Sequence, residues 1–149
     1  MSMINEMIRG LLEEPDMIAA LGNVSACINE VYDRLNWAGF YLVKNGELVL
    51  GPFQGKVACT HIAFDSGVCG ACYREMAVQR VDNVHERRDH IACDAASCSE
   101  LCVPVIVNGQ CVAEIDLDSP EYSRFTETEE KEMLQAASDI AEAWLKHQW

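Results

Sequence analysis

Two Asn-Gly pairs, each placed between apolar or aromatic runs, constrain the fold of this chain more than any other feature. The first is Asn45-Gly46, between residues 37–43 and 47–50, and the second is Asn108-Gly109, between residues 101–107 and 111–117. Asn-Gly readily adopts the positive φ angles of tight hairpin turns, so each pair predicts two adjacent antiparallel strands. A shorter strand is expected around Val81. The central sheet should therefore be largely antiparallel.

Apolar residues at helical spacing predict helices at both ends of the chain. The positions are Met3, Met7, Ile8, Leu11 and Leu12 for a first helix; Ile18, Leu21, Ile28, Val31 and Leu35 for a second, opened by Pro15; and Met133, Ala137, Ile140 and Trp144 for a last one. Thr126 and Glu129 have the spacing of a capping box, which predicts where the last helix starts. Terminal helices packed on an antiparallel sheet make an α+β fold. No repeat or linker interrupts the 149 residues, so a single domain over 1–149 is expected.

The charge balance excludes several kinds of partner. The chain has 24 acidic and 11 basic residues and a formal net charge of -13, which opposes nonspecific binding to nucleic acid or to anionic membranes. A cationic or zwitterionic ligand fits this charge better. The apolar runs are shorter than a membrane span, and the first residues lack the pattern of a secretory signal. We therefore expect a cytoplasmic protein with no nucleic-acid or membrane partner.

The chain has eight cysteines, and each needs its own interpretation. In a reducing compartment, cysteines are core thiols, metal ligands or catalytic groups rather than a disulfide framework. Cys27, Cys102 and Cys111 follow apolar patterns and are expected to pack in the core. Cys98 could serve as an alternative disulfide partner.

Zinc binding is the main alternative chemistry for the cysteines. Cys69-Gly-Ala-Cys72 is a Cys-x-x-Cys sequence, and the possible further ligands are His61, His85, His90 and Cys93. Tetrahedral zinc sites usually combine two paired ligand clusters, and no second Cys-x-x-Cys or clean histidine pair is present. This argues against a structural zinc site, and the sequence predicts neither a metal nor another cofactor.

The predicted strand at residues 111–118 carries three acids on one face. Glu114, Asp116 and Asp118 alternate with apolar residues, which should face the core. From the residues alone, the simplest interpretation is that the acids face water, as in a half-solvated antiparallel sheet. Trp37 and Tyr41 likewise share one face of the first strand, and core packing is their simplest interpretation.

Six local motifs together resemble one family. They are Asn-Trp-Ala-Gly-Phe-Tyr at 36–41, Gly-Lys-Val-Ala-Cys at 55–59, Gly-Val-Cys-Gly at 67–70, His-Ile-Ala-Cys-Asp at 90–94, Ser-Cys-Ser-Glu at 97–100 and Asp-Leu-Asp-Ser-Pro at 116–120. In this order and spacing they resemble free methionine-R-sulfoxide reductase, a stand-alone GAF-domain enzyme, over nearly the whole chain from about Pro15 to Trp144. The resemblance implies a GAF fold, in agreement with the α+β architecture expected from the pattern.

The resemblance also implies roles for three cysteines. Cys93 takes the position of the nucleophile, Cys59 that of the principal resolving cysteine and Cys69 an auxiliary position. A thiol that attacks a sulfoxide becomes a sulfenic acid, which a second cysteine converts into a disulfide. The residues alone do not rank the three thiols: His90, if protonated, favours a Cys93 thiolate, whereas the adjacent Asp94 opposes it.

Five further positions match family positions for the substrate. Glu100, Asp116 and Asp118 would bind the ammonium of an amino acid, because crowded carboxylates repel one another unless a cation joins them. Trp37 and Tyr41 would wall the pocket around the methyl-sulfinyl group. Whether Glu114 enters this pocket or lies at its rim is left open by the sequence.

The resemblance therefore predicts an enzyme that reduces free L-methionine-R-sulfoxide to L-methionine, with thioredoxin or a similar dithiol as reductant. The preference for the R epimer comes from the resemblance alone, as does a possible homodimer. One alternative is a GAF module that binds a small ligand or senses oxidants through its thiols without turnover, since a fold does not determine a function. The other alternative is the structural zinc protein considered above.

Overall fold

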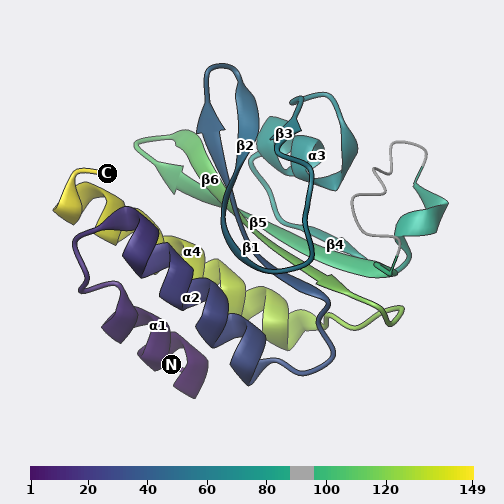
Figure 1. The fold of residues 1–149 in the computed structure, drawn as a ribbon, viewed down its shortest axis with the longest axis horizontal. Helices are drawn as coiled ribbons and strands as arrows, with labels where there is room; N and C mark the ends of the chain where they lie inside the picture. Colours follow the sequence, from purple (N-terminus) through teal and green to yellow (C-terminus); the bar gives the residue numbers. More distant parts are fainter. Residues whose placement is uncertain (88–95) are drawn as a thin grey trace.

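A single six-stranded sheet forms the centre of the computed structural model, which describes residues 1–87 and 96–149 (Figure 1). Its strands are β1 (Trp37–Lys44), β2 (Glu47–Gly55), β3 (His61–Ile62), β4 (Gln79–Val81), β5 (Ser99–Val107) and β6 (Gln110–Ser119). They are ordered β3-β2-β1-β6-β5-β4, and every neighbouring pair is antiparallel. Both Asn-Gly pairs have positive φ at both residues, as hairpin turns of this length require. The predicted antiparallel sheet is confirmed, although β2 extends five residues beyond Leu50.

Two helices, α2 (Met17–Val31) and α4 (Glu127–His147), cover one face of the sheet, and α1 (Met3–Leu11) packs on these two helices (Figure 1). The other face is covered by α3 (Gly67–Glu75), which is followed along the chain by the 3-10 turn η1 (Val84–Glu86). Thr126 and Glu129 form the predicted capping box at α4. None of the helices in the described part of the chain has the length and apolar character needed to cross a membrane.

The second helix differs in detail from its prediction. Asp16, not Pro15, caps α2, with its side chain accepting a hydrogen bond from the backbone N–H of Ala19. The helix ends before Leu35, and Ile18 and Val31 are exposed rather than part of the core. Of the five residues predicted at helical spacing, only Leu21 and Ile28 therefore lie on the buried face of α2.

The main hydrophobic core lies between the sheet and helices α1, α2 and α4. Its fully buried side chains include Ile8, Leu21, Ile28, Phe40, Leu101, Ile115, Leu117, Met133 and Ile140. Alternation along β1, β5 and β6 directs their apolar residues to this face. Burial of such surface supplies about 25 cal/mol per Å² and makes this layer the main source of stability.

A smaller second core covers the opposite face of the same strands. It contains Trp37, Tyr41, Leu48, Ile62, Val68, Cys69, Cys72 and Cys102, with α3 lying over β5 and β6. The central strands are therefore buried on both faces. Glu114 and Asp116, which point to this second face, are almost fully inaccessible, so the simple expectation that these acids face water is wrong.

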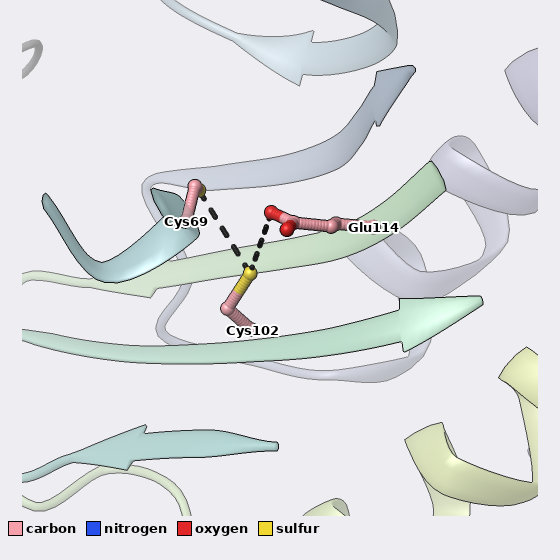
Figure 2. A group of neighbouring side chains, drawn as sticks. All are labelled: Cys69, Cys102 and Glu114. Atoms are coloured by element: carbon pink, nitrogen blue, oxygen red, sulfur yellow. Dashed lines mark hydrogen bonds between the residues drawn. The ribbon is translucent and has the colours of Figure 1, made fainter. Parts of the chain in front are cut away.

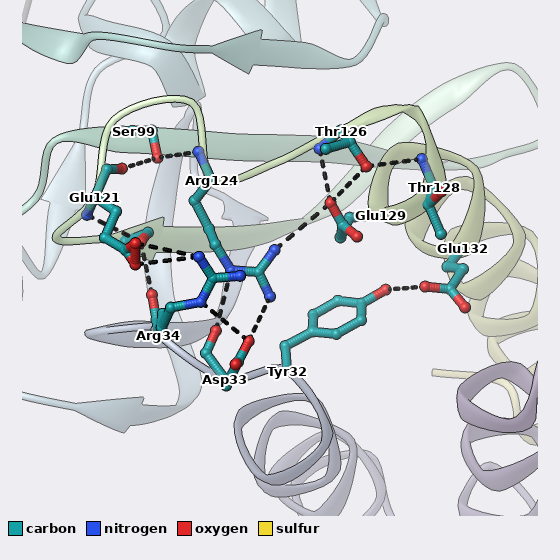
Figure 3. A network of polar contacts seen from close by, with 11 residues as sticks. Tyr32, Asp33, Arg34, Ser99, Glu121, Arg124, Thr126, Thr128, Glu129 and Glu132 are labelled. Carbon is teal, nitrogen blue, oxygen red and sulfur yellow. Dashed lines mark hydrogen bonds and ion pairs between the residues drawn. The ribbon is translucent and has the colours of Figure 1, made fainter.

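A polar network closes one end of the sheet (Figure 3). The Arg124 guanidinium, 7% exposed, donates to the backbone carbonyl and the carboxylate of Asp33 at 3.1 and 3.2 Å and lies 3.6 Å from Glu129. Ser99, next to Glu100, donates to the carbonyl of Glu121 at 2.6 Å and accepts from the Arg124 N–H. These bonds fix the segments that lead into β1 and β5.

Candidate active site

A cavity of about 50 Å³ lies on the α3 side of the sheet. The described residues that line it are Trp37, Tyr41, Val57, Ala58, Ile62, Ser66, Gly67, Val68, Cys69, Ser97, Glu100, Asp116 and Asp118. They come from β1, β3, β5 and β6, from the start of α3, and from the segments after β2 and before β5. Six of the eight candidate site residues named from the sequence, Cys59 and Cys93 being the other two, are thus brought together in one place.

Two aromatic rings form one wall of the cavity. The Trp37 ring stacks on Tyr41, with centroids 5.9 Å apart, and on Phe53, at 5.1 Å. Gly55 at the end of β2 makes this possible, because its φ is +140° and a Cβ there would lie 2.6 Å from Trp37 Cδ1. The Tyr41 hydroxyl donates to the carbonyl oxygen of Cys59 at 2.9 Å, while the buried Nε1 of Trp37 has no hydrogen-bond partner.

Three carboxylates form the floor of the cavity. The β5–β6 ladder places Glu100 directly opposite Asp118, and Asp116 lies two residues earlier on the same face of β6. Burial raises the pKa of Glu100 well above its ordinary value, and the carboxylates of Asp116 and Asp118 raise it further. Burial also raises the pKa of Asp116, although hydrogen bonds with Glu100 and then Cys69 oppose the shift.

The carboxylates of the floor can accept more hydrogen bonds than the described residues donate to them. Asp116 Oδ1 is buried without a hydrogen-bond partner, and the described lining residues include no lysine, arginine or histidine. Burying such a group without a partner costs free energy. A ligand that presents a cationic donor to these oxygens would remove this cost.

Comparison with known proteins gives the same assignment as the motifs. The family model for the GAF domain matches residues 24–144. The chain is 44% identical over 127 residues to free methionine-R-sulfoxide reductase of Escherichia coli, covering 85% of this chain and 77% of the relative, and 42% identical to that of Saccharomyces cerevisiae, covering 83% and 72%. The chain belongs to the GAF-domain family of free methionine-R-sulfoxide reductases.

A solved structure supports the same family at the level of the fold. The free methionine-R-sulfoxide reductase of Neisseria meningitidis, determined in complex with its substrate, superposes with a TM-score of 0.94 at 35% identity. The match covers 97% of this chain and 88% of that structure. The GAF fold expected from the resemblance is therefore confirmed.

The cysteines of this family member occupy different positions around the cavity. Cys69, in the first turn of α3, is buried with Sγ 3.8 Å from Glu100 Oε2. A hydrogen bond with Cys102 lowers its pKa, but burial and the surrounding carboxylates outweigh this effect, so the pKa stands well above the ordinary value. Cys59 is disulfide-bonded, whereas the other described cysteines are free thiols. Cys93 and His90 lie outside the described residues.

The sequence interpretation missed the part of the cavity that is made by backbone and small residues. Ser66, Gly67 and Val68 line it at the start of α3, and the Ser66 side chain makes no capping hydrogen bond to that helix. Ser97 lines it as well and accepts a hydrogen bond from the Asn36 amide at 3.0 Å, which joins two of the family motifs. A Gly-containing turn before a helix was the available signal, since helix N-termini attract anionic groups.

Proposed function

We propose that this protein reduces free L-methionine-R-sulfoxide to L-methionine. The observation that carries the proposal is the cavity itself, which places a stacked aromatic wall, a buried carboxylate floor and a thiol around one small volume. A free amino acid with a sulfoxide side chain offers a complementary group to each of these surfaces. The family members from E. coli, S. cerevisiae and N. meningitidis carry the name of this activity.

Each end of the substrate has a matching surface in the cavity. The ammonium group binds Glu100, Asp116 and Asp118, the three acids that line the cavity floor. The carboxylate lies near the first turn of α3, where backbone N–H groups and the helix dipole favour negative charge. The methyl-sulfinyl group packs against Trp37 and Tyr41.

The chemistry follows from the thiols. The Cys93 thiolate attacks the sulfoxide sulfur, methionine leaves as a thioether, and the oxygen remains on Cys93 as a sulfenic acid. Glu100 donates a proton to the sulfoxide oxygen, a role that fits its raised pKa. The Cys59 thiol then attacks Cys93, releasing the oxygen as water and forming a disulfide. The disulfide-bonded state of Cys59 supports its role as the resolving cysteine, and Cys69 is assigned the auxiliary position.

The reductant, the cellular compartment and the oligomeric state are part of the same proposal. A dithiol protein such as thioredoxin reduces the disulfide and completes the cycle, and the proposed compartment is the cytoplasm, where thiols are kept reduced. Residues 1–149 act as one catalytic GAF domain, and the active protein is a homodimer. Analytical ultracentrifugation of the reduced protein tests the homodimer. A sedimentation coefficient that corresponds to a monomer would contradict the homodimer.

The decisive assay separates the two epimers of the substrate. The reduced protein is incubated with each methionine sulfoxide epimer and excess dithiol, and methionine is quantified. We expect turnover of the R epimer and none of the S epimer. Absence of turnover with either epimer would overturn the proposal in favour of a GAF module that binds a ligand or senses oxidants.

Two cysteine variants test the assigned order of events. Cys93→Ser should release no methionine, because no sulfenic acid forms, whereas Cys59→Ser should release about one methionine per chain and then stall. A single-turnover burst without added reductant measures both. A normal burst from Cys93→Ser would show that the nucleophile is another cysteine.

A further inference from the structure

Two cysteines and a glutamate converge next to the cavity, which Cys69 also lines (Figure 2). Cys69 comes from α3, Cys102 from β5 and Glu114 from β6, so the cluster joins three elements that are distant in sequence. Cys102 Sγ lies 3.8 Å from Cys69 Sγ and 3.2 Å from Glu114 Oε1, and the three ligand atoms all lie within 4.8 Å of one another. Cys72, one helical turn after Cys69, is near enough for Cys102 and Glu114 to shift its pKa, but it lies outside this group of three ligand atoms.

The hydrogen bonds within this cluster are too few for all of its donor and acceptor atoms. Cys102 has one S–H hydrogen but two acceptors within reach, so it serves one of them at a time. Glu114 is fully buried, and its Oε2 atom has no hydrogen-bond partner among residues 1–87 and 96–149. A buried carboxyl oxygen without a partner costs free energy, and a bound cation is one way to remove that cost.

The spacing of the ligand atoms suits a tetrahedral ion that prefers sulfur. Two thiolates bound to one zinc ion at about 2.3 Å each lie roughly 3.8 Å apart, and a thiolate and a carboxylate oxygen lie roughly 3.6 Å apart. The two distances in the cluster, 3.8 and 3.2 Å, are close to these values. The sequence interpretation named three histidines and Cys93 as possible partners of Cys69-Gly-Ala-Cys72, whereas the fold places Cys102 and Glu114 next to Cys69.

We propose that the reduced protein binds one thiophilic divalent ion such as Zn²⁺ through Cys69, Cys102 and Glu114. The thiols release their protons to solvent as the ion binds. The ion enters through the cavity, because Cys69 also lines it. Since Cys69 is then engaged as a ligand, the metal-bound form cannot use it as an auxiliary thiol. Metal binding itself does not depend on the proposed reductase activity.

The test uses the full chain with Cys59→Ser and Cys93→Ser, so that these two thiols cannot bind the ion. The reduced protein is titrated with Co²⁺ without oxygen, and thiolate-to-cobalt charge-transfer absorption is recorded. Equilibrium dialysis with Zn²⁺ gives the stoichiometry. We expect one ion per chain, with a charge-transfer intensity of two thiolates and the visible bands of tetrahedral cobalt.

Further substitutions in this background locate the ligands. Glu114→Gln keeps the size of the side chain and should weaken Zn²⁺ binding at least tenfold, and Cys102→Ala should weaken it more. Cys111→Ala is the matched control, since Cys111 is a buried free thiol outside the cluster, and should leave binding unchanged. Circular dichroism verifies that each variant is folded.

Absence of saturable Co²⁺ or Zn²⁺ binding in the parent, or equal binding by the folded Glu114→Gln and Cys111→Ala variants, would overturn the metal site. The charge-transfer intensity of the parent decides the question even if Cys102→Ala does not fold. The epimer assay on the wild-type chain reports separately on the reductase, so failure of one proposal is distinguished from failure of the other.

Discussion

Two groups of carboxylates in this molecule have opposite electrostatic surroundings. At the end of the sheet, Asp33 and Glu129 flank the buried Arg124 guanidinium (Figure 3). In the cavity, Glu100 and Asp116 are buried together, and no described lining residue carries a positive charge. The Arg124 guanidinium balances the first group within the protein, whereas the ammonium of the proposed substrate would balance the second. Acids paired internally therefore stabilise the fold, and acids left without a cation indicate a site.

The largest effect that tests this contrast concerns the substrate itself. N-acetylation converts the ammonium of methionine sulfoxide into a neutral amide, so the cavity acids lose the cation that joins them. Removing one partner of a buried charge pair costs about 3 kcal/mol, or roughly a hundredfold in kcat/KM. The measurement is steady-state kinetics on the free and N-acetylated R epimers, and equal kcat/KM values would refute ammonium recognition.

Arg124→Ala should act on stability rather than on catalysis. The substitution removes hydrogen bonds from a buried guanidinium to Asp33 and should lower the free energy of unfolding by about 2 kcal/mol. Urea denaturation measures this change, and KM for the sulfoxide should stay within about twofold of wild type. Arg34→Ala, at an exposed ion pair with Glu121, is the control and should have little effect. A large rise in KM with unchanged stability in Arg124→Ala would contradict the assignment of this ion-pair network to the stability of the fold.

Asp116→Asn should have the opposite effects to Arg124→Ala: it should impair catalysis and leave stability intact. Replacing a buried acid that lacks a partner for Oδ1 should leave the free energy of unfolding unchanged or raise it. The kcat/KM for the free substrate should fall about tenfold, and the difference from the N-acetylated substrate should narrow, because one carboxylate no longer attracts the ammonium. Urea denaturation and kinetics on both substrates measure the two effects. A variant that loses stability and keeps its kinetics would place Asp116 among the structural acids.

The smallest expected effect is the difference between removing the Tyr32 hydroxyl and removing the Tyr41 hydroxyl. Tyr32 donates to Glu132 at 2.7 Å, and Tyr41 donates to the carbonyl of Cys59 at 2.9 Å. Each Tyr→Phe change should cost about 1 kcal/mol of stability. Tyr41→Phe should in addition slow disulfide formation by Cys59, measured by rapid quench and mass spectrometry, whereas Tyr32→Phe should not. Equal rates in both variants would show that this hydrogen bond does not position Cys59.

The sequence by itself determined the features that depend on local backbone preference. The two Asn-Gly turns, the capping box of α4 and the antiparallel hairpins follow from residues close together in the chain. It also named Trp37, Tyr41 and the three floor acids through motifs that resemble a family, and these line one cavity. Cys93, the expected nucleophile, lies outside the described residues, so its position stays a prediction.

The tertiary structure alone decided what covers each face of the sheet. Alternation along a strand tells which residues share a face, but not whether that face meets water or another layer. Helix α3 and the segment after β2 close over the acids of β6, which buries Asp116 and Glu114 instead of solvating them. The meeting of Cys69, Cys102 and Glu114 has the same origin, because contacts between distant segments depend on strand order and helix placement that no local pattern encodes.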